Sequence, residues 1–215
     1  MPVVKRAKRK PRQPALRTAP KQERAVQTRD RLLDIAGELL GEVGIERVST
    51  NMIAANAGVS PAALYRYFKD KYAVLEALGR RFMDRQNAVL FAWLEKYGPQ
   101  GLEALSENVE ELVRATADVT SGEPGGVWIE RAMRAVPQLA HVRVESHREV
   151  TDAMLEVYAP LLPRVNRKAL WRRLRMMVEF GYAIDEMLNE EDRIPRAEIF
   201  REAAVLLASA RLEDE

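Results

Sequence analysis

Hydrogen-bond donors of several kinds gather over residues 49–71, where the chain reads STNMIAANAGVSPAALYRYFKDK. Hydroxyl, amide, phenol, guanidinium and ammonium groups alternate there with small residues, and all of them can donate to phosphate oxygens or to base edges. Large tyrosines are costly to expose, so their place beside Pro61, Ala62 and Ala63 calls for a reason. The pattern indicates a surface that binds nucleic acid, where small residues allow close approach.

Two short helices and a tight turn are predicted to position these donors. Ser49 or Thr50 can cap the first helix, and Gly58 can supply the turn that ends it. Ser60 can cap the next helix with Pro61 at its first position, where a missing N–H costs nothing. Two short helices joined by a short turn that contains glycine form a helix-turn-helix.

Helical spacing predicts which face of the second short helix points outward. Leu64 and Phe68 are four residues apart, and we expect them to face inward together with Val59. The remaining residues then lie outside or on the flank, and the small ones let the N-terminal end of the helix enter a major groove. The alternative for Tyr65 is a ring packed on neighbouring helices with its hydroxyl in water.

This stretch resembles the DNA-binding signature of the TetR family of bacterial repressors, over about residues 26–78. The resemblance rests on many spacings that agree at once. It implies an all-α fold in which the remaining two-thirds of the chain form a variable ligand-binding region. The matching positions are Ile53-Ala54, Ala57-Gly58-Val59-Ser60, Leu64-Tyr65, Phe68, Lys71 and Leu75.

The resemblance also implies residue roles. Thr50 and Asn51 stand where such proteins contact phosphate and sometimes a base, and Lys71 stands where they hold a phosphate. The first three residues of the recognition helix lie nearest the base edges, and three residues further along contact bases or backbone. These six are Pro61, Ala62 and Ala63, then Tyr65, Arg66 and Tyr67. Ala62 departs from the family pattern, in which glycine is frequent at that position.

Positive charge is concentrated at the N-terminus. Residues 1–22 carry eight Lys and Arg side chains and no acid, and because the whole chain has a net charge of +2, the remaining residues sum to −6. Residues 23–72 are neutral, with seven basic and seven acidic side chains. We expect residues 1–22 to form a disordered basic arm that adds salt-sensitive affinity for DNA. The alternatives are a solubilising tail and an arm for an anionic membrane surface.

Every segment with a clear hydrophobic period predicts a helix, so the expected fold class is all-α with about nine helices. We expect three parts: the basic arm at 1–22, a helix-turn-helix domain at 23–72, and a ligand-binding and dimerisation domain at 73–215. The short helices described above are two of the nine. The others are expected at about 24–43, 71–96, 102–119, 125–135, 138–159, 166–189 and 196–212.

Two apolar stripes run along the helix expected at 166–189, and a helix apolar on two sides buries against two neighbours. With 196–212 it resembles the pair that builds the four-helix dimer interface of TetR-type proteins. We therefore expect a homodimer through these two helices, matched to a palindromic operator; an ordinary monomeric core is the alternative. One stripe is Leu170, Leu174, Met177, Val178, Gly181, Ile184 and Leu188, and the other is Met176, Phe180, Ala183 and Met187.

Methionine and aromatic side chains after residue 80 are candidates for a ligand pocket, because such residues line adaptable apolar sites. Each of them equally suits an ordinary core, and the class of small-molecule effector stays unknown. Glu179 lies among apolar neighbours, and we expect it to pair with Arg175 one turn earlier rather than to neutralise a cationic ligand. The pocket candidates are Phe82, Met83, Trp93, Trp128, Met133, Met154, Met176 and Phe180.

No catalytic site, metal site or cofactor is expected. The chain has no cysteine, and its two histidines, His141 and His147, are six residues apart and so lie on different faces of a predicted helix. It shows no phosphate-cradling glycine loop and no nucleophile elbow. No apolar run approaches the roughly 20 residues that span a bilayer, and no signal-peptide core follows the basic N-terminus. We expect a cytoplasmic protein without a membrane partner.

The expected function is ligand-responsive regulation of transcription, in which a homodimer on operator DNA is released by a small molecule. That it represses rather than activates comes from the family resemblance alone. The alternative is a DNA-binding architectural or helical interaction module without ligand control. The length of chain after the helix-turn-helix exceeds what DNA attachment requires, which favours a sensing domain.

Overall fold

The computed structural model describes residues 21–210 and 212, and within these residues every regular element is a helix. The predicted basic arm lies outside the described residues, apart from Lys21 and Gln22, which begin the first helix. Short 3-10 turns follow α4, at Gly98–Gln100, and α7, at Pro137–Leu139. The α-helices are α1 Lys21–Arg47, α2 Thr50–Asn56, α3 Pro61–Leu64, α4 Lys71–Tyr97, α5 Leu102–Glu107, α6 Val109–Gly122, α7 Gly126–Ala135, α8 Ala140–Leu161, α9 Arg167–Glu190 and α10 Arg196–Ala208.

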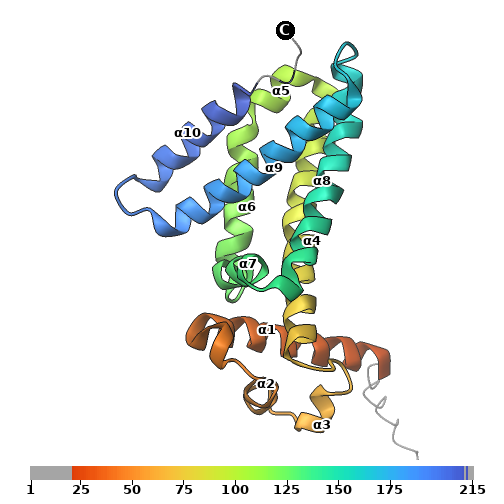
Figure 1. The fold of residues 1–215 in the computed structure, drawn as a ribbon, viewed down its shortest axis with the longest axis vertical. Helices are drawn as coiled ribbons and strands as arrows, with labels where there is room; N and C mark the ends of the chain where they lie inside the picture. Colours follow the sequence, from red (N-terminus) through yellow and green to blue (C-terminus); the bar gives the residue numbers. More distant parts are fainter. Residues whose placement is uncertain (1–20, 211, 213–215) are drawn as a thin grey trace, which may run out of the picture.

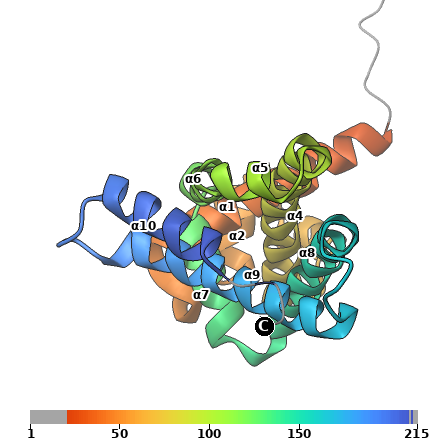
Figure 2. The same ribbon diagram turned by 90° about the horizontal axis from the view of Figure 1, so that it is seen from above.

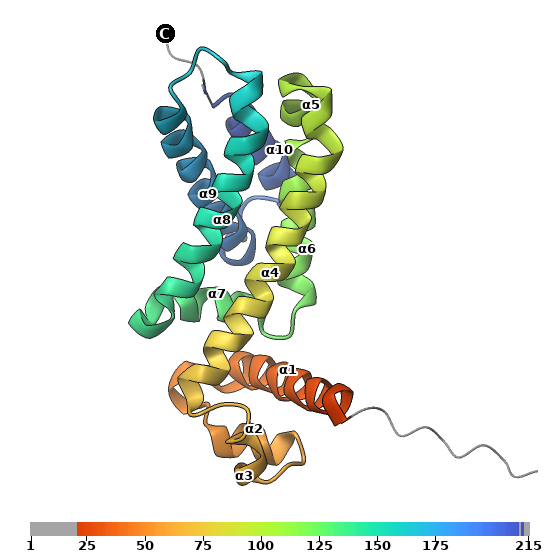
Figure 3. The ribbon, with the colours of Figure 1, turned by 90° about the vertical axis from the view of Figure 1, so that its right-hand side faces the viewer.

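The helices form a small lower part and a larger upper bundle. In Figure 1, α1, α2 and α3 make the lower part, and α4 leads from it up into the bundle. Figure 3 shows α4 running between α8 and α6, and α7 lies across the junction of the two parts. From above (Figure 2), α10 lies at one edge of the molecule beside α9.

The lower part and the base of the bundle share one hydrophobic core. Leu32 of α1, Ile53 of α2 and Leu64 of α3 are fully buried in it. The same cluster includes Ile129 of α7 and Val142 of α8. Packing is therefore continuous across the predicted domain boundary at residues 72 and 73, and the division of the chain into those domains stays a prediction.

The recognition helix is shorter than the sequence suggested. Helix α3 ends at Leu64 after one turn, whereas the i, i+4 spacing of Leu64 and Phe68 predicted a helix that carries both. The backbone continues in tighter turns, in which Arg66 N donates to Ala63 O and Tyr67 N donates to Leu64 O. Phe68 still turns inward, because its amide donates to Leu64 O at 3.1 Å.

One predicted helix is two helices in the structure, which raises the number from nine to ten among the described residues. The helix expected at 102–119 is interrupted at Asn108. The side-chain amide of Asn108 donates to Ala104 O at 2.8 Å, and the backbone carbonyl of Asn108 accepts the indole N–H of Trp93 at 2.9 Å. Asparagine competes with helical backbone bonds in this way, so the helix restarts at Val109.

The loop between α6 and α7 docks closely on α1. A Cβ on Gly125 would lie 2.1 Å from Gly37 O, and a Cβ on Gly37 would lie 2.2 Å from Pro124 O. Gly125 also has a φ of 70°, where other residues are strained. This backbone contact requires glycine at both positions.

Replacing Gly125 by alanine is expected to lower the free energy of unfolding by roughly 1–3 kcal/mol, since it adds both backbone strain and overlap. Urea unfolding followed by circular dichroism measures the change. Gly122→Ala is the matched control, because a Cβ there meets nothing within 4 Å. The control should keep or slightly raise stability, and an equal loss in both variants would contradict the close contact.

Candidate nucleic-acid interface and internal cavity

Two serine caps and one glycine fix the helices of the candidate interface. Ser49 Oγ accepts from Met52 N at 3.3 Å, so α2 begins as predicted. Ser60 Oγ accepts from Ala63 N at 3.2 Å and starts α3 in the same way. Gly58 has a φ of 67°, as the predicted turn requires. Local sequence therefore sets the geometry of both short helices.

The inward face of the interface is confirmed. Leu64 is fully buried, Phe68 is 4% exposed, and Val59 packs against the same core cluster. The opposite face is left to solvent. Of the predicted DNA-binding residues, Asn51, Pro61, Ala62, Tyr65 and Arg66 are exposed, and Thr50, Ala63, Tyr67 and Lys71 are half-buried.

Tyr65 stands half in solvent with its hydroxyl held in place. Its ring is 50% exposed, and its hydroxyl lies 3.1 Å from Thr50 Oγ1. The bond joins the start of α2 to the end of α3. Whichever hydroxyl accepts in this bond keeps its own O–H to donate to an incoming phosphate. DNA contact by Tyr65 stays a prediction.

Lys71 begins α4 at the edge of the same surface. Its ammonium donates to Ile45 O at 3.0 Å and lies 5.6 Å from the ring centre of Tyr72. An ammonium has three donors, so this bond leaves others for a phosphate. The carboxylate of Asp70 is occupied in capping α4, through a bond from Ala73 N at 2.8 Å.

Two further side chains complete this surface. Tyr67 packs against the core cluster, with its ring centre 6.4 Å from that of Phe68, so only part of it faces solvent. Lys69 is exposed two residues before Lys71 and was not among the predicted DNA-binding residues. Its signal was a cation next to the YRYF segment, and we add it to the candidate phosphate contacts.

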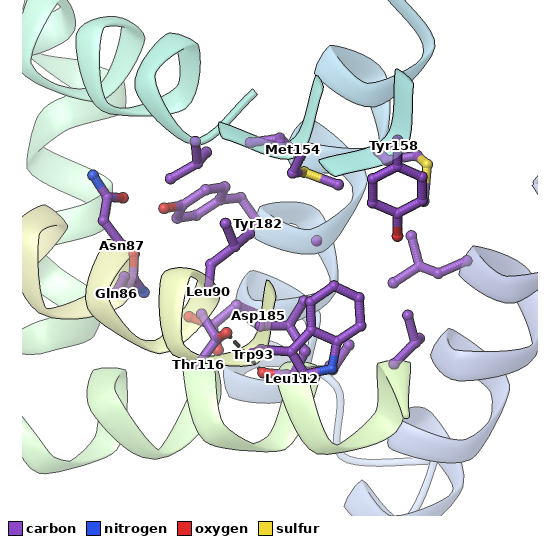
Figure 4. A pocket seen from close by; sticks show the side chains of 17 residues that line it. Gln86, Asn87, Leu90, Trp93, Leu112, Thr116, Met154, Tyr158, Tyr182 and Asp185 are labelled. Carbon is purple, nitrogen blue, oxygen red and sulfur yellow. Dashed lines mark hydrogen bonds between the residues drawn. The ribbon is translucent and has the colours of Figure 1, made fainter. Parts of the chain in front are cut away.

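The upper bundle contains a partly open cavity of about 90 Å³ between α4, α6, α8, α9 and α10. Figure 4 shows the amides of Gln86 and Asn87 toward one end of the lining and the ring of Tyr158 toward the other. The volume gives room for several water molecules or a small organic molecule. The lining consists of Gln86, Asn87, Leu90, Trp93, Val109, Leu112, Val113, Thr116, Val150, Met154, Tyr158, Met177, Val178, Gly181, Tyr182, Asp185 and Leu207.

The predicted pocket residues fall into three places. Trp93 and Met154 line the cavity. Trp128, Met176 and Phe180 are exposed on the surface, at 44%, 58% and 54%. The rest lie in the core that joins the two parts of the molecule, so they are not brought together with the cavity. Those core residues are Phe82, Met83 and Met133. Ligand contact by any of the eight stays a prediction.

A buried polar cluster that was not predicted reaches the cavity through Gln86 and Asp185, and we call it the polar floor. Gln86 Nε2 donates to Thr120 Oγ1 at 3.0 Å, and Thr120 Oγ1 donates to Asp185 Oδ2 at 2.6 Å. Gln86 Nε2 also lies 3.4 Å from Glu130 Oε1. All four side chains are at most 5% exposed. The available signal was Asp185, which follows Gly181 by one helical turn on the apolar stripe of α9.

Burial governs the ionisation of the two acids. Burial, and then the charge of Asp185, raises the pKa of Glu130 to about 8. Burial also raises the pKa of Asp185, against the hydrogen bond from Thr120. At neutral pH Glu130 therefore holds its proton, and the acceptor role of Asp185 toward Thr120 fits a carboxylate.

Glu130→Gln is expected to flatten the fall of stability with rising pH. A carboxyl whose folded pKa is raised binds its proton more tightly when folded, so its contribution is greatest below about pH 4.5 and is lost as pH rises through about 8. The slope removed is at most about 1.4 kcal/mol per pH unit. Urea unfolding from pH 5.5 to 8.5 measures it, and the exposed Glu107→Gln is the control. Parallel curves for all three proteins would contradict the assignment.

A second buried cluster lies beside the cavity, at the contact of α8 and α9. His147 is fully buried, its Nδ1 lies 3.1 Å from Glu179 Oε1, and its ring stacks on Tyr182 at 4.1 Å. Burial lowers the pKa of His147 to about 4, so the ring is neutral. Burial raises the pKa of Glu179, but hydrogen bonds from Arg175 and His147 outweigh it and bring it to about 2. The predicted pair of Glu179 with Arg175 is confirmed at 2.6 Å.

Ion pairs connect α4 to both α1 and the end of α6. Arg81 Nη1 lies 2.8 Å from Asp34 Oδ1 of α1, and Arg81 Nη2 lies 2.7 Å from Glu123 Oε1. Arg85 also pairs with Glu123. Glu123 is 4% exposed, and buried pairs of this kind are costly to break one partner at a time.

Helices α9 and α10, which contact each other, both leave large apolar side chains in solvent, and we call these exposed residues together the α9–α10 face. It consists of the second stripe predicted on α9 together with residues of α10, whereas Leu170, Leu174 and Leu188 of the first stripe are buried. Exposed large apolar side chains gathered on neighbouring helices are typical of interaction sites. The exposed members are Met176, Phe180, Met187, Val205 and Leu206.

Groups of three or more His, Cys, Asp or Glu side chains suited to hold a metal ion are absent from the described residues. Among the same residues, no helix is both long and apolar enough to cross a membrane.

Known proteins share both the N-terminal segment and the fold. The family model described as "Bacterial regulatory proteins, tetR family" matches residues 32–78. The chain is 45% identical over 47 residues to an HTH-type transcriptional regulator of Staphylococcus aureus, which covers 22% of this chain but only 25% of that relative. It is 27% identical over 170 residues to the HTH-type transcriptional regulator UidR of Escherichia coli, which covers 76% of this chain and 84% of UidR.

Solved structures resemble the whole described chain. A transcriptional regulator from Pseudomonas aeruginosa matches with a TM-score of 0.67 and 17% identity, over 90% of this chain and 94% of that one. A tetR-family transcriptional regulator from Streptomyces coelicolor matches with a TM-score of 0.66 and 20% identity, over 86% and 80%. At such identities the likeness shows the fold.

Proposed function

Since this chain is a DNA-binding transcriptional regulator of the TetR family, we propose that it is a homodimeric repressor released from a palindromic operator by a small molecule. The surface formed by α2, α3 and the start of α4 is the proposed DNA contact, with residues 23–72 as the DNA-binding part. Residues 73–215 are the proposed sensing and dimerisation part.

The observation that carries the proposal is the reach of a single helix. Helix α4 begins at Lys71, on the candidate DNA surface, and lines the cavity with Gln86 and Trp93. At about 1.5 Å per residue, Lys71 lies roughly 22 Å along the helix from Gln86 and roughly 33 Å from Trp93. A ligand that shifts α4 in the cavity therefore shifts the DNA-contacting end of the same rigid element.

A second connection supports this coupling. Helix α6 also lines the cavity, and the loop that follows it holds Glu123 against Arg81 and Gly125 against α1. Displacement of α6 would therefore pull on α1 as well as on α4. Interfaces packed this closely shift between discrete arrangements rather than deform smoothly.

The α9–α10 face supports the proposed dimer. Met176, Phe180 and Leu206 are each more than half exposed in the single chain. Pairing these helices with their copies in a second chain would bury them as a four-helix interface. Two DNA-binding parts related by a two-fold axis then fit inverted half-sites, and a ligand that changes their spacing lowers affinity for the operator.

Selection of DNA by the purified full chain tests the proposal. Random duplexes retained by the protein should converge on two inverted half-sites about one helical turn apart. Gel shift on the selected duplex should then give one complex with two chains. Convergence on a single unrepeated site would argue against the dimeric reading, and no convergence would favour the architectural module.

A further inference from the structure

We propose that the cavity of this regulator takes an amphipathic cation, a protonated amine carried on a small apolar body. The inference rests on the proposed function, because it names the class of the effector. It starts from Gln86 and Asp185, which line the mostly apolar cavity and are connected to each other through Thr120, with Glu130 3.4 Å from the Gln86 amide.

The floor presents acceptors that lack donors. The chain of bonds from Gln86 Nε2 through Thr120 Oγ1 to Asp185 Oδ2 orients all three side chains. Among the described residues, no N–H group is in place to donate to Asp185 Oδ1 or Gln86 Oε1, and besides Thr120 the hydrogen-bond partner of Asp185 is the protonated carboxyl of Glu130. Both residues line the cavity and are at least 97% buried. Buried acceptors left unpaired are costly, so the missing partner is a hydrogen-bond donor.

The charge of the floor points to a cation rather than a neutral donor. Arg131, whose charge acts on Glu130, makes its ion pairs with Glu186 and Glu190 instead, at 2.8 and 2.9 Å. Arg196 is the cation that acts on Asp185 through its charge. Its guanidinium instead donates to Leu188 O at 2.5 Å and lies 5.8 Å from the Phe200 ring centre.

The proton on the acid pair does not satisfy the site. Burial keeps Glu130 protonated at neutral pH, and a proton shared between the two carboxyls leaves one negative charge on the pair. It also leaves Gln86 Oε1 without a donor. An ammonium has three N–H donors and a positive charge. One such group can therefore neutralise the charge on the acid pair and also donate a hydrogen bond to Gln86 Oε1.

The apolar lining residues indicate that the remainder of the ligand is apolar. Leu90, Met154, Met177 and Val178 supply aliphatic surface, and Trp93 supplies an aromatic face. Methionine and aromatic side chains adapt to varied apolar bodies. A carboxylate ligand is disfavoured, because Asp185 would repel it and because the basic cluster around Glu179 is engaged in its own ion pairs.

Three probes with one body and different heads test the charge preference in the wild-type chain. 2-Phenylethylamine, propylbenzene and 3-phenylpropanoate share a phenylethyl group and present an ammonium, a methyl group or a carboxylate. Calorimetric titration at pH 7.5 should show the amine binding at least about tenfold more tightly than propylbenzene, since a charge-assisted bond is gained. The carboxylate should bind most weakly.

The variant Asp185→Asn tests whether the preference for the amine depends on the carboxylate of the polar floor. The variant should lose about tenfold in affinity for the amine and keep its affinity for propylbenzene, which shows that the cavity is intact. Asp118→Asn, on the exposed side of α6, is the control and should match wild type. Equal binding of all three probes to wild type, which would mean that water satisfies the two acceptors, overturns the proposal. So does absence of binding, or the tightest binding by the carboxylate. If Asp185→Asn does not fold, the wild-type ranking still decides.

The outcome is separate from that of the proposed function. Probe binding is measured without DNA, and DNA selection is carried out without probe. A regulator that selects inverted half-sites but prefers the carboxylate probe would keep its proposed function and lose this inference. Binding of the amine by a chain that selects no DNA would do the reverse.

Discussion

Ala62→Glu is expected to remove specific DNA binding while leaving the fold unchanged. Ala62 is exposed in the first turn of α3. The family resemblance implies that this turn lies nearest to the base edges of bound DNA. A carboxylate there meets the negative potential of the groove and fills the space that the small side chain leaves open. Affinity for the selected duplex should fall by roughly a hundredfold or more, about 2.7 kcal/mol.

The substitution should not harm folding, because an acidic side chain is favourable at the start of a helix. Ala88→Glu is the matched control, because Ala88 is exposed on α4. This substitution makes the same change in charge away from the candidate interface. Fluorescence anisotropy with the selected duplex, and circular dichroism for the fold, separate the two effects. Equal affinity of both variants and wild type would remove α3 from the DNA contact.

Phe180→Glu is expected to convert the proposed dimer into monomers. Phe180 is 54% exposed in the single chain and lies between Met176 and Ala183 on the α9–α10 face. In an isologous interface the change occurs twice, once on each chain. Burying two unpaired carboxylates at the centre of an apolar contact is strongly unfavourable. The dimer dissociation constant should rise by roughly a hundredfold or more.

Sedimentation equilibrium over a range of protein concentrations measures this change. Trp128→Glu is the control, because Trp128 is a large apolar residue that is 44% exposed on α7, outside the α9–α10 face. The Phe180→Glu monomer should also lose affinity for the full palindrome while keeping weak binding to a half-site, since each recognition surface is intact. A variant that sediments like wild type would place the dimer contact elsewhere.

The lower part of the molecule was predictable because its signals are local. Serine caps, a glycine with positive φ and the i, i+4 pair of Leu64 and Phe68 act within a few residues of one another, so the sequence carries them directly. The length of α3 was not predictable, because tight turns and a second helical turn bury the same two side chains.

In helix α9, the hydrophobic period predicts two apolar stripes but not which of them is buried. Two apolar stripes were evident from the spacing, and the structure buries Leu170, Leu174 and Leu188 of one stripe while exposing Met176 and Phe180 of the other. Both stripes are apolar with the same period, so the sequence could not say which faces the chain's own core. That choice depends on where α6, α8 and α10 pack.

The residues that line the cavity could not be predicted from the sequence for a similar reason. Trp93 and Met154 line it, whereas Phe82 and Met133, of similar chemical character, fill the shared core. The floor joins Gln86, Thr120 and Asp185 from three helices that are far apart along the chain.

The sequence by itself determined most of the helices, the serine caps, the turn of the helix-turn-helix segment and the resemblance to the TetR family, because each depends on residues that are neighbours in the chain. Only the tertiary structure decided which apolar face stays in solvent, which side chains enclose the cavity and which acids meet in its floor. Those features depend on which helices pack together, and burial and charge pairing take their values only after that packing is complete.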